Sequence, residues 1–289
     1  MKRRFLALVL AGCLAAVLST AAWATETPTS VSTESELTTA LGDTAVTSIQ
    51  LKGNIDISNT LVVTKDVTLD LNGFVLQHEN RDANDSVIKI ESGTLTLVDS
   101  NPDAIHKFVK EATGLWTLNE NAGTEIVKGG VITGGTGSTY KYNNDIGQIV
   151  YNDCGGGVFV APGASFIMEG GNIVGCSAGK SGGGVKVTND GDFKMSGGTI
   201  SGCTAGGGGG IDNRGTTTLS DNAKIKSCSA TGTGRDDHGG GVCSYRNLTV
   251  SGSMVISGCT AQNNKSYAMY VTTGYPDARS SIEHRRRNI

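Results

Sequence analysis

Polar and apolar residues alternate over short runs along most of this chain, and glycines separate the runs. Val185-Lys186-Val187 and Phe193-Lys194-Met195 are two examples. A period of two places the apolar side chains on one face of an extended strand. Glycine supports the tight turns that join such strands. The pattern therefore predicts many short β-strands joined by sharp corners.

The strands belong to a repeated unit. Four segments open on glycine triplets at residues 155, 182, 208 and 239, so their starts are 27, 26 and 31 residues apart. Equivalent positions hold the same residue types: Val158, Val185, Ile211 and Val242; Met168, Met195, Leu219 and Val250; Ile173, Ile200, Ile225 and Ile256; Cys176, Cys203, Cys228 and Cys259; Ala178, Ala205, Ala230 and Ala261. A degenerate copy, residues 124–135, precedes them.

Each copy has the length and pattern of three short strands. It is too short for a four-stranded propeller blade and lacks the helical half of a leucine-rich repeat. It suits one coil of a parallel β-helix, in which successive coils stack about 4.8 Å apart. The Ile and Cys columns then become structural ladders along the interior.

The rest of the chain divides around this repeat. Residues 25–47 are an N-terminal segment with a capping helix at 33–41, which would cover the open apolar end of the solenoid. The β-helix extends over 48–270, with early strands at 48–51, 61–63 and 67–71 and further rungs in 87–100. Three stretches depart from the pattern: 101–121, 140–153 and 231–238. Residues 271–289 are an irregular basic tail without an evident cap, so the C-terminal end is expected to pack end to end or against more protein.

The first residues read as a targeting signal. Lys2, Arg3 and Arg4 precede an apolar run, and Ala22-Trp23-Ala24 is a small-x-small cleavage site. These features are typical of a secretory signal peptide over residues 1–24. The apolar run could also serve as an uncleaved membrane anchor. Leu10-Ala11-Gly12-Cys13 resembles a lipobox, so a lipoprotein signal that ends before Cys13 is the other alternative. We expect a secreted or cell-surface protein, attached to a membrane only through lipid on Cys13.

Net charge excludes one class of partner. The whole chain carries a formal charge of −3, and the signal peptide holds three of its positive charges. A chain this acidic lacks the electrostatic footprint of a nucleic-acid binder.

The order of these features resembles a known family. A short helix, the strand and turn at 68–73 (TLDLNG), the segment 92–100 (SGTLTLVDS) and glycine-led coils look like secreted bacterial proteins of the pectin-lyase-like superfamily. The adhesin-like, polymorphic-repeat members are the most similar. The resemblance covers residues 30–270 and implies an all-β, right-handed, single-stranded parallel β-helix with an N-terminal capping helix. It leaves activity open, because the superfamily holds lyases, hydrolases, esterases, tailspikes and adhesins.

The glycines and cysteines are expected to be structural. No helix follows the glycine triplets, so they form no phosphate-binding loop. The spacing of the cysteines fits no zinc site. We expect buried reduced thiols in the ladder, with pairing of Cys154 or Cys243 open in an exported protein.

The candidate functional residues lie in segments that depart from the repeat. The catalytic candidates are Arg235, Asp236, Asp237 and His238, because hydrolases use paired carboxylates. A lyase would add calcium as cofactor; the other interpretations need no metal or cofactor. The candidates for carbohydrate contact are the following tyrosines: Tyr140, Tyr142, Tyr151, Tyr267 and Tyr270.

The function that fits best is a non-enzymatic, adhesin-like binder of host or polysaccharide surfaces. The alternatives are a polysaccharide lyase or glycoside hydrolase acting on acidic polysaccharide, and a structural spacer or fragment of a larger surface protein.

Overall fold

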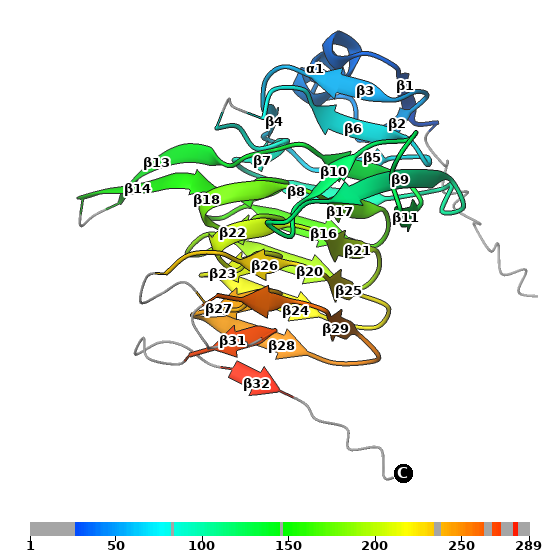
Figure 1. The fold of residues 1–289 in the computed structure, drawn as a ribbon. Helices are drawn as coiled ribbons and strands as arrows, with labels where there is room; N and C mark the ends of the chain where they lie inside the picture. Colours follow the sequence, from blue (N-terminus) through cyan, green and yellow to red (C-terminus); the bar gives the residue numbers. More distant parts are fainter. Residues whose placement is uncertain are drawn as a thin grey trace, which may run out of the picture.

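The computed structural model describes residues 27–81, 84–144, 147–233, 238–262, 268–272 and 280–282. These residues form an all-β solenoid with one short helix, as the repeat predicts. Figure 1 shows the coils stacked from α1 at one end to β32 at the other. The described residues contain no helix that is long and apolar enough to span a membrane.

Four sheets form the walls, and each is built mainly from parallel strands of successive coils. Sheet A contains β1 (Thr29–Val31), β2 (Ser48–Leu51), β5 (Val67–Asp70), β8 (Thr94–Val98), β16 (Ser165–Met168), β20 (Asp192–Met195), β24 (Thr216–Leu219), β28 (Asn247–Val250) and β32 (Ser280–Ile282). Sheet B contains β3 (Ile55–Ile57), β6 (Val75–His78), β12 (Val131–Thr133), β17 (Asn172–Val174), β21 (Thr199–Ser201), β25 (Lys224–Lys226) and β29 (Val255–Ser257).

The other two walls are sheets C and E. Sheet C contains β4 (Leu61–Val63), β7 (Ile88–Ile90), β15 (Val158–Val160), β19 (Val185–Val187), β23 (Ile211–Asn213), β27 (Val242–Ser244) and β31 (Met269–Val271). Sheet E contains β13 (Ser138–Asn144), β14 (Gly147–Cys154), β18 (Ser177–Ser181), β22 (Thr204–Gly207), β26 (Ser229–Ala230) and β30 (Thr260–Ala261).

A regular coil follows the path C, A, B, E, so each copy of the repeat has four strands. The sequence pattern predicts three, and that number is wrong. The missed strand lies in sheet E, where residues such as Thr204-Ala205-Gly206 are too small and too uniform to show an apolar alternation. Hydrogen bonding between coils, rather than side-chain periodicity, defines this wall.

The interior is filled by ladders of like residues. Ile173, Ile200, Ile225 and Ile256 occupy paired positions of β17, β21, β25 and β29. Phe166 and Phe193 stack with ring centroids 5.0 Å apart. Because parallel strands bring equivalent positions together, a sequence repeat becomes a continuous apolar core.

Glycine is required where each coil turns into sheet C. The first glycine of each triplet has positive φ: Gly155 (+68°), Gly182 (+68°), Gly208 (+59°) and Gly239 (+66°). A Cβ added to Gly182 would lie 2.9 Å from Lys186 Cα. The corner therefore combines a left-handed backbone with close packing against the next strand.

Helix α1 (Glu34–Gly42) covers the N-terminal end of the solenoid, in agreement with the predicted cap. Thr33 caps it by accepting a hydrogen bond from Glu36 N. Leu37, Ala40 and Leu41 are buried against the coils. Lys65 Nζ donates to the carbonyl oxygen of Ala40 near the helix C-terminus, where a cation is favourable.

Residues 101–128 leave the solenoid and form a separate antiparallel sheet. This sheet D contains β9 (Ile105–Lys110), β10 (Trp116–Leu118) and β11 (Glu125–Lys128). The Asp99 carboxylate accepts hydrogen bonds from Gly73 N and Gly130 N, both at 2.7 Å, so the chain leaves and re-enters at one corner. The predicted degenerate copy at 124–135 is thus only half right. β12 joins sheet B, whereas β11 pairs with β9 outside the stack.

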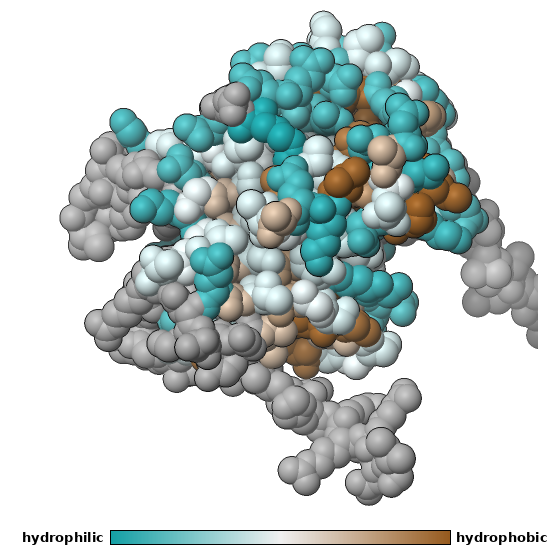
Figure 2. Space-filling model, in the orientation of Figure 1, coloured by the Kyte–Doolittle hydropathy of each residue, from teal (hydrophilic) through white to brown (hydrophobic). Residues whose placement is uncertain are grey.

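Sheet D packs on the outer face of sheet B. Phe108, Trp116 and Val127 bury against sheet B residues, including Val131 and Val174, and make a second, smaller core. In Figure 2 brown apolar surface remains over this region. The exposed apolar side chains there are Ile105 (57% exposed) and Ile126 (55% exposed).

The excursion predicted at 140–153 is the hairpin β13–β14, which extends from the side of the solenoid in Figure 1. Cys154 at its end pairs with Ser181 of β18, so the hairpin continues sheet E.

Shortening one ladder residue tests the stacking. Ile225→Ala should lower the free energy of unfolding by about 2–5 kcal/mol, because a fully buried side chain leaves a cavity. Lys224→Ala, one residue earlier and exposed on the same strand, should change it by less than about 0.5 kcal/mol. Urea unfolding of both variants measures the difference, and equal effects would contradict a packed interior.

Candidate functional site

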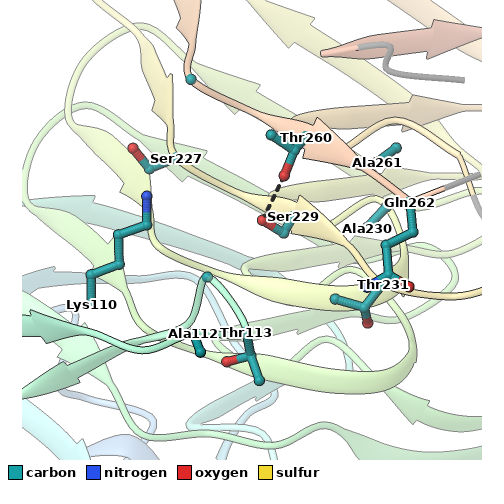
Figure 3. Close-up of a pocket in the computed structure, with 12 residues that line it drawn as sticks. Lys110, Ala112, Thr113, Ser227, Ser229, Ala230, Thr231, Thr260, Ala261 and Gln262 are labelled. Carbon is teal, nitrogen blue, oxygen red and sulfur yellow. Dashed lines mark hydrogen bonds between the residues drawn. The ribbon is translucent and has the colours of Figure 1, made fainter. Parts of the chain in front are cut away.

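A groove of about 310 Å³ lies between sheet D and the solenoid. The turn between β9 and β10 provides one side, with Lys110, Ala112, Thr113 and Gly114. Sheet E and its preceding corner provide the other, with Ser227, Ser229, Ala230, Thr231, Gly258, Thr260, Ala261 and Gln262. Figure 3 shows the hydroxyl groups and the Gln262 amide around this opening. The groove exists because the inserted sheet overhangs the fourth wall.

Hydroxyl groups form a ladder along this wall. Ser177, Thr204, Ser229 and Thr260 occupy paired positions of β18, β22, β26 and β30. Ser229 and Thr260 share a hydrogen bond of 2.9 Å, drawn in Figure 3. Each hydroxyl is both a donor and an acceptor. Along the sheet, hydroxyls therefore recur at the spacing of neighbouring strands, about 4.8 Å.

Lys110 gives the groove its charge. Its side chain is exposed at the end of β9, and in Figure 3 its ammonium lies on the side of Ser227. The described residues that line the groove include no carboxylate and no imidazole. The groove is therefore polar and cationic, which suits a hydroxyl-rich anion.

A second cluster occupies the outer face of sheet C. The middle residues of its strands stand in register in a column that includes Phe159, Lys186, Asp212, Cys243 and Tyr270. The first four are at most 1% exposed, although they point away from the solenoid interior. Asp212 is the middle residue of β23.

Asp212 organises the charges of this cluster. Its Oδ1 contacts Lys186 Nζ and lies 3.5 Å from Arg214 Nε. The Arg214 guanidinium lies 4.9 Å from the ring centre of Tyr245. Asn189, Arg214, Tyr245 and Arg246 line a cavity of about 150 Å³ beside the pair. Two basic side chains thus approach the same carboxyl oxygen of Asp212.

Burial also raises the pKa of two acidic groups near Asp212, the Cys243 thiol and the Tyr245 hydroxyl. Burial, together with the charge of Asp212, raises the pKa of Cys243 to about 12. Burial, together with Cys243, likewise raises the pKa of Tyr245. Both groups are therefore neutral at physiological pH, and Cys243 is no nucleophile.

The structure describes some of the predicted catalytic and aromatic residues and not others. His238 is buried, with its ring 4.4 Å from that of Tyr270, and Tyr270 lies 6.3 Å from Tyr245. Among the described residues, His238 Nδ1 has no hydrogen-bond partner. Arg235, Asp236, Asp237 and Tyr267 lie outside the described residues, as do the signal peptide and Cys13.

The tyrosines of the excursion lie in sheet E. Tyr140 pairs with Tyr151 across the hairpin, and Tyr142 pairs with Ile149. The backbone thus brings all three tyrosines into one small hairpin, at the opposite end of sheet E from β30.

The cysteine ladder lies inside the solenoid. All six cysteines of the described residues are free thiols. Cys203 and Cys228 Sγ donate to carbonyl oxygens of the preceding coil, Ile173 O and Ile200 O, each at 3.8 Å. Burial raises the pKa of Cys176, Cys203 and Cys228. In contrast, a side-chain hydrogen bond with Cys228 lowers the pKa of Cys259, which is only partly buried.

Metal binding has no visible site in the part of the chain that the structure describes, because no three His, Cys, Asp or Glu side chains gather there.

Sequence reasoning missed the groove and the charged column. The groove depends on how sheet D packs on the solenoid, and the clearest sign of this packing is Gly202. A Cβ on Gly202 would lie 2.1 Å from Trp116 Cγ, and Trp116 N donates to Gly202 O. The sequence did contain a signal for the charged column. The position that follows Gly-Gly-Gly-Val/Ile varies between copies, and in two consecutive copies it holds Lys186 and Asp212.

The comparison with protein families agrees with the fold. The family model of the right handed beta helix region matches residues 106–284. The chain therefore belongs to the right-handed β-helix family. No curated protein and no solved structure matches it. This architecture fits a surface or carbohydrate-related protein and does not distinguish binding from catalysis.

The docking of sheet D can be tested at Gly202. Gly202→Ala should expose Trp116, because the added Cβ collides with its ring, and the Trp116 fluorescence should shift to the red. Gly163→Ala is the matched control: its φ is +78° and no atom lies within 4 Å of an added Cβ. Equal spectra for the two variants would show that sheet D does not rest on Gly202.

Thiol labelling tests the ladder. In the folded protein, Cys259 should react with iodoacetamide before the other ladder cysteines, because its pKa is lowered and its side chain is partly exposed. Cys176 and Cys203 should react only after unfolding, because burial raises their pKa. Peptide mapping after timed labelling measures the order; early labelling of Cys203 would contradict its place in the interior.

Proposed function

We propose that this chain is an exported, adhesin-like protein that binds an acidic polysaccharide, without cleaving it, in the groove between sheet D and sheet E. The observation that carries the proposal is the hydroxyl ladder of sheet E, which lines this groove. Among the described residues that line the groove, Lys110 is the one cation.

The chemistry of the groove matches a glycan. Sugar hydroxyls donate and accept hydrogen bonds, and so do Ser229, Thr231 and Thr260. The Lys110 ammonium favours a carboxylate or sulfate on the sugar. A polymer that runs along the solenoid axis meets an equivalent hydroxyl on each coil, so weak contacts add up along its length.

The same residues favour binding over cleavage. Hydrolysis of a glycosidic bond uses two carboxyl groups at a defined separation, and the described lining of the groove has none. The hairpin β13–β14, with Tyr140 and Tyr151 in paired positions, extends sheet E farther. It offers additional length for the same polymer.

Native gels that contain polygalacturonate test this proposal. The full chain should be retarded in them and should migrate normally in gels with neutral dextran. Lys110→Gln should raise the dissociation constant obtained from the retardation about tenfold, because it removes one charged hydrogen bond. Lys194→Gln, an exposed lysine of sheet A, is the matched control and should bind like the unmodified chain.

The same incubations should release no reducing ends and no unsaturated uronate. Release of either product would establish the enzymatic alternative. Equal retardation of the Lys110 and Lys194 variants would place the polysaccharide outside this groove.

A further inference from the structure

The pair Lys186 and Asp212 has an unusual setting for two opposite charges. The residues are paired on the neighbouring parallel strands β19 and β23, in consecutive coils. Lys186 Nζ contacts Asp212 Oδ1, and the side chains are 1% and 2% exposed. Phe159 precedes them in the column and Cys243 follows, and both are buried. The amine and the carboxyl group are thus held together out of water.

Burial of this kind is expensive for ions. Each charge loses its hydration, and the attraction between the two repays that loss only in part. An amide made from the same two groups carries no charge and needs less hydration. Sequestration from water therefore favours the condensed product over the ion pair more than it would on a surface.

From this geometry we propose that Lys186 and Asp212 form an intramolecular isopeptide bond. A proton passes from Lys186 Nζ to the Asp212 carboxylate across their contact, which leaves a neutral amine and a carboxylic acid. The Nζ lone pair then attacks Asp212 Cγ. The new C–N bond forms, one C–O bond breaks, and the oxygen leaves as water with two protons. The reaction needs no oxidant, reductant or second substrate.

Two features of the site assist this step. The fixed approach of the groups replaces a bimolecular encounter, an effect that reaches an effective concentration of about 10⁵–10⁸ M in well-oriented reactions. Arg214 Nε lies 3.5 Å from Asp212 Oδ1, the oxygen that takes the proton and leaves, so its positive charge stabilises the negative charge that develops there as the C–O bond breaks. Arg214 is in turn held over the ring of Tyr245. Lys186 and Asp212 supply the reacting atoms, and Arg214 stabilises the charge.

The bond would fasten one coil to the next near the middle of the stack. A link between residues 186 and 212 closes a loop that includes β20, β21 and β22. It would be insensitive to reducing agents, unlike a disulfide, and so would suit a protein that works outside the cell.

Peptide mapping of the full-length purified chain tests the bond. After denaturation and digestion with trypsin, the bond should protect Lys186 from cleavage. Residues 181–194 should then appear joined to residues 195–214, lighter than the sum of the two peptides by the mass of one water molecule. Fragmentation should locate the link at Lys186 and Asp212, which separates it from dehydration at Asp190-Gly191.

Lys186→Arg is the matched control, because it keeps the charge but cannot form this amide. Trypsin should cleave this variant after the substituted position, so its digest should contain residues 181–186, 187–194 and 195–214 as separate peptides. The proposal is overturned if the unmodified chain is cleaved after Lys186 and yields residues 181–186 and 187–194 free. That result would leave the pair as a buried salt bridge.

Discussion

The whole structure depends on the register of hydrogen bonds between coils. Each strand of a regular coil pairs with the equivalent strand of the next, so a residue meets its own counterpart from another copy of the repeat. Side chains that stack well on themselves then fill the interior, which explains the ladders of isoleucine, phenylalanine and cysteine. The same register places serine and threonine in one outward row. The core and the proposed binding surface thus follow from a single constraint.

The insertion of sheet D adds what the repeat cannot provide. A plain solenoid has flat walls, and a groove needs a second body beside one of them. Asp99 makes this addition possible, because its carboxylate binds Gly73 N and Gly130 N and closes the corner where the chain departs and returns. Gly202 then leaves room for Trp116 on the coil beneath. The insertion consequently changes the surface without interrupting the stack.

The sequence contained most of the fold and little of the site. Repeat spacing was sufficient to predict the solenoid, because like residues at matching positions can be compared along one chain. The capping helix was also predictable, since Thr33 and Glu36 lie three residues apart, a spacing typical of a helix N-terminus. Sheet D was not, because its docking depends on the contact between Trp116 and Gly202, which are far apart in sequence. The strand in sheet E was missed for another reason: Ala205 and Gly206 show no alternation.

The candidate residues show the same limit. His238 and Tyr270 were separate suggestions from the sequence, and only the stacking of coils brings their rings together. Lys186 and Asp212 stood one repeat apart, in a column that alignment of the copies makes visible. The groove itself combines residues 110–114 with residues 227–231 and 258–262, and no local pattern connects these segments.

The inserted sheet D creates the proposed binding groove on an otherwise self-sufficient solenoid. Removal of residues 101–128 joins Ser100 to Gly129 at the corner that Asp99 closes, and Val131→Thr with Val174→Thr makes the uncovered face of sheet B polar. The measurement is the migration of this shortened chain in polygalacturonate gels, after cooperative unfolding has shown that it folds. We predict a folded protein without retardation. Retardation equal to that of the full chain would contradict the account.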